Sequence, residues 1–241
     1  MKYIEISRLA SNDQRAHSAI IALRIVLVIL IVRAILAPIG WLIFSNGADD
    51  LSPEMKSAVL FMNQTTQIYF VAEFLLTNVY QLAFLVCGII FLMWFSRAYQ
   101  NLNILTGETD RAQGWAIGSW FIPLVNLWVP FRIMCEFFEK THRKLTEHGA
   151  ISNPPSKWIP GVVRGWWICW IVGGMLNIIT FLPMLDIGDS QSALRTKAIG
   201  GIPLLIMAIS ALLCIRVIRR FLVLNDLLLE YESVESLGGE W

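Results

Sequence analysis

Four long apolar stretches dominate the pattern of this sequence. They run over residues 19–44, 69–95, 165–187 and 199–221. Each is longer than the roughly 20 mostly apolar residues that a helix needs to cross the hydrocarbon of a bilayer. The pattern therefore predicts an all-α integral membrane protein with four transmembrane helices.

A fifth apolar stretch, residues 112–131, contains residues that interrupt helices. It carries no charge, but it includes Gly114, Pro123 and Pro130. Proline removes a helical hydrogen bond and clashes with the preceding turn, and broken backbone at membrane depth must be covered by protein or water. We therefore expect a re-entrant or interfacial helical segment over about 112–148 instead of a fifth span.

The positions of Lys and Arg separate the two arrangements. With four spans and an inside N-terminus, 14 of the 19 basic residues lie inside, three lie outside and two fall within the first span. With five spans the split is seven inside against ten outside. Short cytoplasmic loops are enriched in Lys and Arg, so the charges favour four spans with both termini in the cytoplasm.

Composition agrees with a membrane location. The chain has 241 residues, of which 56% are apolar and 15% charged, whereas a soluble domain has about 45–50% and about 25%. The net charge of +1 gives no reason to expect nucleic acid as a partner. We expect one membrane domain over residues 1–241 that contacts membrane lipids and ends in a cytoplasmic tail at 222–241.

Tryptophan is distributed unevenly in this arrangement. Eight of the ten tryptophans fall at or near the cytoplasmic boundary, and tryptophan is enriched at bilayer interfaces. Two interpretations are open. The indoles either form a layer in which residues 112–131 enter the cytoplasmic leaflet, or they are ordinary interfacial anchors.

Residues 130–148 have the period of an amphipathic helix. One face carries the apolar set Phe131, Met134, Cys135, Phe138, His142 and Leu145. The other carries charged residues, with Arg132–Glu136 and Glu139–Arg143 as i,i+4 pairs. This helix is expected either to lie on anionic headgroups or to pack against the bundle.

The last apolar stretch is expected to continue as a cytoplasmic helix. Phe221, Leu224, Leu228 and Tyr231 recur at intervals of three and four residues. This seam is a candidate surface for a protein partner or for self-association.

Polar side chains within the spans are costly and usually have a partner or a task. The candidates are Arg33, Glu73, Thr77, Gln81 and Asn177. Arg33 and Glu73 are expected at similar depth and could form an ion pair, with Asp186 as a rival partner for Arg33. The other interpretation is a polar path for an ion or small solute, but residues 82–95 contain no acidic or basic side chain.

Sequence motifs of catalysis or metal binding are not evident. The four cysteines are far apart in sequence and form no CxxC, and the three histidines lie outside the middle of the spans. We expect no metal, no cofactor and no catalytic residue. An enzyme is therefore the least favoured class of function.

One extended motif follows the second stretch. It reads W-x-x-R-x-Y-x-N from Trp94, then G-W-A from Gly114, then W-F-I-P-x-x-N-L-x-x-P from Trp120. In these elements, in this order and followed by a Trp-rich span, the chain resembles the bacterial membrane family catalogued as domain of unknown function 4328. The resemblance covers about residues 70–220 and implies a bacterial inner-membrane location without assigning a reaction.

The motif residues allow two interpretations, a structural elbow or a pocket for a lipid phosphate and its chains. The candidate pocket residues are Arg97, Tyr99, Asn101, Trp115, Trp120, Asn126 and Trp128. We expect an integral membrane component that binds lipid or a protein partner without catalysis. The alternative is a subunit of a transporter or channel for ions or small solutes.

Overall fold

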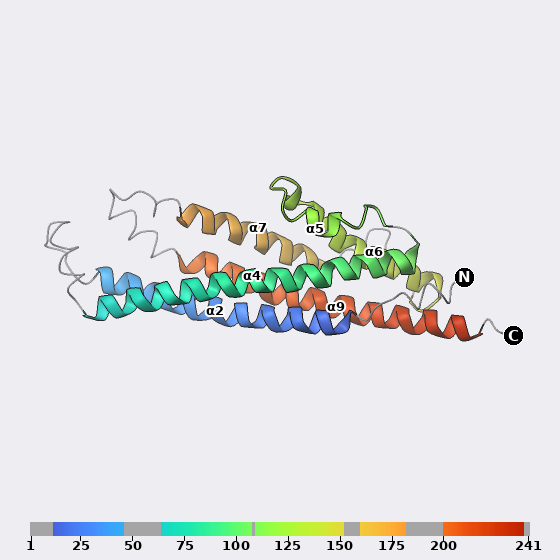
Figure 1. The fold of residues 1–241 in the computed structure, drawn as a ribbon, viewed down its shortest axis with the longest axis horizontal. Helices are drawn as coiled ribbons and strands as arrows, with labels where there is room; N and C mark the ends of the chain where they lie inside the picture. Colours follow the sequence, from blue (N-terminus) through green and yellow to red (C-terminus); the bar gives the residue numbers. More distant parts are fainter. Residues whose placement is uncertain (1–11, 46–63, 108, 152–159, 182–199, 239–241) are drawn as a thin grey trace. The chain divides into compact units, whose positions relative to one another are not determined.

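The computed structural model describes residues 12–45, 64–107, 109–151, 160–181 and 200–238. The described part of the chain is helical and contains no strand (Figure 1). In chain order the elements are α2 (Asp13–Ser45), α4 (Gln64–Thr106), α5 (Trp115–Gly118), the 3-10 helix η1 (Val125–Leu127), α6 (Val129–Glu147), α7 (Gly161–Phe181) and α9 (Gly201–Gly238).

Four of these helices are long and apolar enough to cross a membrane. The qualifying segments are Asp13–Gly40 of α2, Gln64–Thr106 of α4, Gly161–Thr180 of α7 and Gly201–Glu232 of α9. This confirms the predicted fold class with four membrane helices. The predicted end of the third span, residues 182–187, lies outside the described residues.

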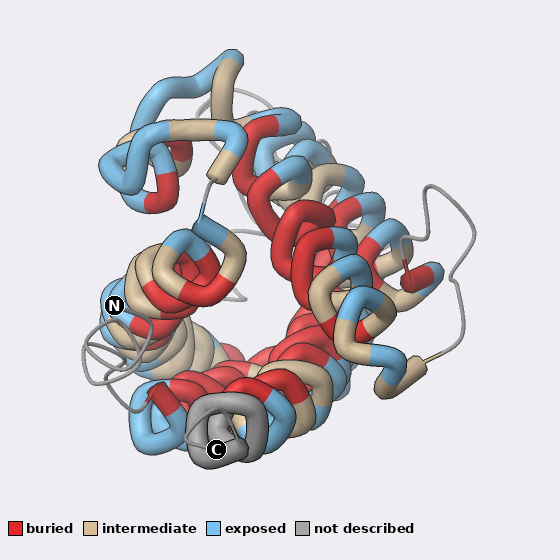
Figure 2. Tube along the Cα trace, turned by 90° about the vertical axis from the view of Figure 1, so that its right-hand side faces the viewer, coloured by how far each residue is buried: buried red, intermediate tan, exposed pale blue. Residues whose placement is uncertain are grey.

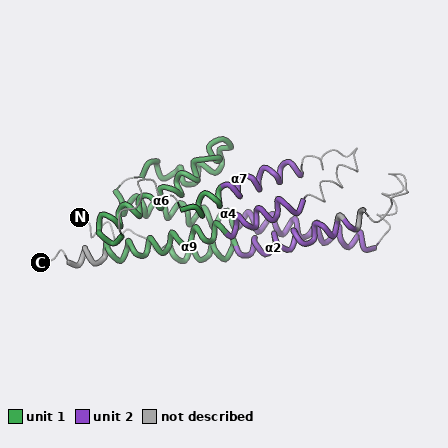
Figure 3. The backbone as a smooth tube through the Cα atoms, turned by 180° about the vertical axis from the view of Figure 1, so that it is seen from behind, with its two compact units in different colours: residues 1–23, 87–167, 213–241 green, residues 24–86, 168–212 purple. Residues whose placement is uncertain are grey.

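The chain divides into two compact units, and each membrane helix contributes residues to both (Figure 3). Unit 1 consists of residues 1–23, 87–167 and 213–241. Unit 2 consists of residues 24–86 and 168–212. The units are therefore not successive segments of the sequence.

Unit 2 contains apolar helices with few polar contacts. On α4, side chains such as Phe74, Val79 and Leu82 are exposed, as expected for a surface that faces lipid. Gly40 of α2 lets the ring of Tyr69 on α4 approach the helix backbone, because a Cβ at position 40 would overlap the Tyr69 ring.

Unit 1 has an aromatic core. The ring of Phe137 from α6 lies 4.9 Å from that of Phe221 on α9 and 5.1 Å from that of Phe95 on α4. Trp94, next to Phe95, is fully buried and packs edge-on against Phe137. Aromatic pairs at such distances add about 0.5–1.5 kcal/mol beyond the burial of their area. Indoles predicted at the interface, Trp94 among them, thus form part of a protein core.

Helix α6 is buried more completely than its sequence pattern predicts. Buried and exposed positions alternate along the helices (Figure 2). The predicted apolar residues Met134, Cys135, Phe138 and Leu145 are buried on α6. Leu145 also forms a cluster with Leu105 of α4 and Leu228 of α9. Helix α6 therefore packs against its own chain, which is one of its two predicted placements.

Candidate functional site

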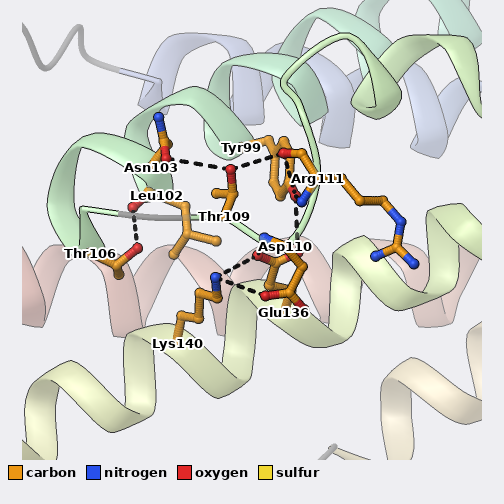
Figure 4. A network of polar contacts seen from close by, with 9 residues as sticks. All are labelled: Tyr99, Leu102, Asn103, Thr106, Thr109, Asp110, Arg111, Glu136 and Lys140. Carbon is orange, nitrogen blue, oxygen red and sulfur yellow. Dashed lines mark hydrogen bonds and ion pairs between the residues drawn. The ribbon is translucent and has the colours of Figure 1, made fainter.

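A polar cluster joins the end of α4, the loop after it and α6 (Figure 4). We call it the clasp and define it as Tyr99, Asp110, Arg111, Glu136 and Lys140. Tyr99 lies near the C-terminal end of α4, whereas Glu136 and Lys140 lie one turn apart on α6. The loop that carries Asp110 and Arg111 leaves α4 at Gly107, whose φ of 79° favours glycine.

The Glu136 carboxylate is the centre of the clasp. Its Oε1 accepts hydrogen bonds from the backbone N–H of Asp110 at 2.6 Å and from Nζ of Lys140 at 2.9 Å. Its Oε2 accepts a hydrogen bond from the hydroxyl of Tyr99 at 3.0 Å. The Tyr99 oxygen in turn accepts from the backbone N–H of Arg111 at 3.1 Å. Both oxygens of a buried carboxylate are therefore satisfied, as a buried charge requires.

The ammonium group of Lys140 is paired with two carboxylates of the clasp, those of Glu136 and Asp110. Glu136 is 3% exposed and Lys140 is 6% exposed. Nζ of Lys140 lies 3.0 Å from Oδ1 of Asp110, whose side chain is largely exposed. Burial alone lowers the pKa of Lys140, but its hydrogen bonds to Glu136 and Asp110 and the attraction of both carboxylates raise the pKa overall. Lys140 is thus held as a cation, and the clasp fixes the loop to α6.

The sequence analysis assigned Glu136 to the charged face of this helix, as an i,i+4 partner of Arg132, and this pairing is wrong. Glu136 pairs with Lys140, which the same charged face carries, and both residues are buried. The reason is that α6 is covered on two sides. Ile133 and Phe137, which lie next to these charges around the helix, are also buried. These two apolar residues opposite the predicted apolar face were the sequence signal that the helix is buried on both sides.

Between the loop of the clasp and α6 the chain forms a turn-rich segment, residues 115–128, which we call the elbow. It contains the single turn α5 and the 3-10 helix η1. Seven of its large apolar side chains are exposed: Trp115, Ile117, Phe121, Ile122, Leu124, Leu127 and Trp128. Leu124 is 78% exposed and Phe121 is 72% exposed. Apolar exposure this dense on one short segment is typical of surfaces that contact membrane or a partner.

The elbow is fixed from behind by the aromatic core. Trp120 packs edge-on against Phe95 of α4 at 5.9 Å and against Trp167 of α7 at 5.9 Å. Nε1 of Trp167 donates a hydrogen bond to the backbone oxygen of Leu127 at 3.0 Å. Ser119, just before Trp120, is fully buried. The exposed side chains are therefore presented by an anchored segment.

The structure separates several residues of the predicted lipid pocket. Tyr99 belongs to the clasp and Trp120 to the aromatic core. Trp115 and Trp128 are exposed, and Arg97 donates a hydrogen bond to Oε1 of Gln100 on its own helix. A pocket around Arg97 stays a prediction.

The two amides in the predicted pocket differ in burial. Asn101 lies two residues after Tyr99 on α4 and is buried. Asn126 lies half-buried in the elbow, and its backbone N–H donates to the oxygen of Ile122 at 2.8 Å. Asn126 thus contributes to the turn that shapes the elbow.

Unit 2 contains the ion pair that the sequence suggested. Nη2 of Arg33 on α2 lies 3.2 Å from Oε1 of Glu73 on α4. The guanidinium of Arg33 also lies over the Tyr80 ring, 5.2 Å from its centroid. The rival partner Asp186 lies outside the described residues. Glu73 and Arg33 therefore connect two membrane helices.

Among the described residues, the other three candidates, Thr77, Gln81 and Asn177, do not extend this pair. Thr77 is half-buried and Gln81 is exposed. Nδ2 of Asn177 donates to the backbone oxygen of Gly173 on its own helix at 2.8 Å. The described contacts thus favour the structural interpretation over a polar path.

The predicted seam on the C-terminal helix is partly occupied by the chain itself. Phe221 and Leu228 are buried, whereas Tyr231 is exposed. Glu232 lies on the same helix, α9. Its Oε1 is 3.0 Å from Nε2 of His148, the residue directly after α6. A protein partner or second copy on this helix stays a prediction.

Together the four apolar helices and the anchored elbow define a multi-pass membrane protein. Residues 60–222 match the sequence profile described as Domain of unknown function (DUF4328), and the chain belongs to this family. No curated protein and no solved structure matches the chain. Among the described residues, no group of three or more His, Cys, Asp or Glu could hold a metal ion.

Proposed function

We propose that this protein is a non-catalytic component of the bacterial inner membrane that binds the lipid of the cytoplasmic leaflet through the elbow. One observation carries the proposal: the elbow exposes seven large apolar side chains within residues 115–128 although the core holds it in place. Transferring apolar surface from water to lipid contributes about 25 cal/mol per Å². An interfacial position of the elbow would recover this free energy.

The two ends of the elbow support entry and exit on the same side of the membrane. Leu105, before the elbow, and Ala150, after α6, pack in one hydrophobic cluster. Tyr99 and Glu136, which also flank the elbow, share a hydrogen bond. A segment that crossed the bilayer between these positions would separate them by the hydrocarbon thickness of about 30 Å.

The anchors of the elbow support a shallow position. Trp120 packs against Phe95, which is where the second apolar stretch ends, and against Trp167, near the start of the third. The charge pattern favours a cytoplasmic position for both of these ends. Broken backbone is tolerated there because headgroups and water can satisfy its polar groups.

The depth of the elbow can be measured directly. In a variant with the four native cysteines replaced by alanine, a nitroxide label is attached to Leu124→Cys or, as a control, to Arg143→Cys on the exposed side of α6. The full chain is placed in nanodiscs of phosphatidylcholine and phosphatidylglycerol. We expect the label at 124 to collide mainly with dissolved oxygen and the label at 143 mainly with a water-soluble nickel complex.

This measurement also tests the alternatives. A label at 124 that is as accessible to the nickel complex as the label at 143 would overturn the lipid-contact proposal and leave a protein partner as the explanation of the exposed surface. A label at 124 near the bilayer midplane would contradict a shallow segment and favour a fifth span.

A further inference from the structure

Two arginines next to the elbow have no carboxylate partner among the residues that the structure describes. Arg132, in the first turn of α6, is exposed, and its predicted partner Glu136 is held by Lys140. Arg164, in the first turn of α7, is also exposed. Neither arginine forms an ion pair among the described residues.

Ring packing brings these two arginines to the same region. Phe131, adjacent to Arg132, stacks on Trp167 with centroids 6.2 Å apart, and Trp167 lies one turn after Arg164. Trp167 also holds the end of the elbow through its hydrogen bond to Leu127. Both arginines therefore lie beside the exposed apolar residues at the end of the elbow.

Cys135 lies close enough to Arg132 and Arg164 for both positive charges to affect the pKa of its thiol. Burial and the nearby carboxylate of Glu139 raise the pKa of Cys135 to about 12, whereas Arg132 and Arg164 act in the opposite direction. Glu139 is exposed and forms no ion pair within the described chain. The charged groups that act on Cys135 are thus two cations and one carboxylate.

We propose that Arg132 and Arg164 bind the phosphate of an anionic phospholipid whose acyl chains lie against the exposed side chains of the elbow. Arginine suits this role because its planar N–H groups can bind phosphate oxygens in pairs. Leu127 and Trp128 lie next to these cations and offer apolar surface for the chains. This inference rests on the proposed function, since it requires the elbow to be in the leaflet.

Lipid preference tests the proposal. The full chain is reconstituted in vesicles of phosphatidylcholine with 30% phosphatidylglycerol and extracted with a styrene–maleic acid copolymer, and the ratio of the two lipids in the discs is measured. Arg132→Gln/Arg164→Gln is compared with Arg219→Gln/Arg220→Gln, which neutralises two exposed arginines on α9. A basic residue near an anionic surface contributes about 1 kcal/mol, or about fivefold.

We expect the first pair of substitutions to lower the relative affinity for phosphatidylglycerol at least fivefold and the second pair to lower it less than twofold. Arg132→Lys/Arg164→Lys should retain part of the preference, and Glu139→Gln should raise it. Equal losses in the two glutamine pairs, or no loss in the first, would overturn the anionic-lipid site.

The nitroxide at position 124 separates failure of this inference from failure of the proposed function. A label that stays at lipid depth in Arg132→Gln/Arg164→Gln, without a change in lipid ratio, overturns only the anionic-lipid site. A label exposed to water in the otherwise unsubstituted chain overturns both proposals.

Discussion

The hydroxyl of Tyr99 donates a hydrogen bond to Oε2 of Glu136 at 3.0 Å, although 37 residues separate the two positions. The intervening chain includes the whole elbow. This bond, with the ion pair between Glu136 and Lys140, closes the base from which the elbow projects. The geometry of the elbow therefore depends on a charge that is buried outside it.

Removing the centre of the clasp should destabilise the protein strongly. Glu136→Ala leaves the buried Lys140 with the exposed Asp110 as its remaining carboxylate partner, and breaking a buried pair costs about 3–5 kcal/mol. Tyr99→Phe removes one hydrogen bond to a charged group and should cost about 1–3 kcal/mol. Thermal unfolding in detergent, followed by tryptophan fluorescence, measures both effects.

A double substitution separates the ion pair from general damage to the core. Glu136→Leu/Lys140→Met removes both charges, and such replacements are often neutral or stabilising. We expect it to recover most of the stability lost in Glu136→Ala. The exposed Arg143→Gln should change stability by less than about 0.5 kcal/mol. A double variant as unstable as Glu136→Ala would show that the loss does not come from breaking the buried Glu136–Lys140 pair.

Stability should also depend on pH through His142. Burial lowers the pKa of this residue below its usual 6.5. The unfolded chain therefore binds more protons than the folded chain between the two values, so stability is fully present above about pH 6.5 and falls as the pH drops toward the folded pKa. We expect His142→Gln to have a weaker decline than the unsubstituted chain between pH 7.5 and 5.5. The midpoint of thermal unfolding at each pH provides the test, and parallel declines would contradict the assignment.

The positions flanking the elbow offer a test of topology. Thr106 ends α4, and Ala150 packs against the cluster that contains Leu105. With the native cysteines replaced, Thr106→Cys and Ala150→Cys should both react with a membrane-impermeant maleimide only when the cytoplasmic face is accessible. Labelling of intact spheroplasts against inverted membrane vesicles measures this. Reaction of the two positions from opposite faces would require a fifth crossing and would refute the interfacial elbow.

The positions of the membrane helices could be predicted because they depend on composition over 20 or more residues. The sequence also indicated the Arg33–Glu73 pair, since the cost of a charge in the membrane leaves few partners at the right depth. Helical continuity beyond the membrane was predictable for α9, where Phe221 and Leu228 keep the spacing of a buried face.

The clasp could not be predicted in the same way. Periodicity assigns a residue to one face of a helix, but it does not show how many faces are covered. Glu136 and Lys140 are buried because the loop after α4 folds over a second side of α6, and Asp110 contributes a backbone N–H that any residue except proline would provide. The partners of Glu136 thus come from tertiary structure and have no signature in the local sequence.

The Arg33–Glu73 pair should behave as a coupled unit within the membrane. Arg33→Leu leaves Glu73 without its cation, and Glu73→Leu leaves Arg33 over Tyr80 without its carboxylate. Each single variant should be destabilised by about 3–5 kcal/mol, the usual cost of breaking a buried pair, whereas Arg33→Leu/Glu73→Leu should lose much less. A double-mutant cycle of unfolding in mixed micelles gives the coupling free energy directly. The exposed Gln81→Leu on the same helix serves as the control and should be nearly neutral. If the two single losses simply add in the double variant, the side chains do not stabilise each other, and a path role for Glu73 becomes the better explanation.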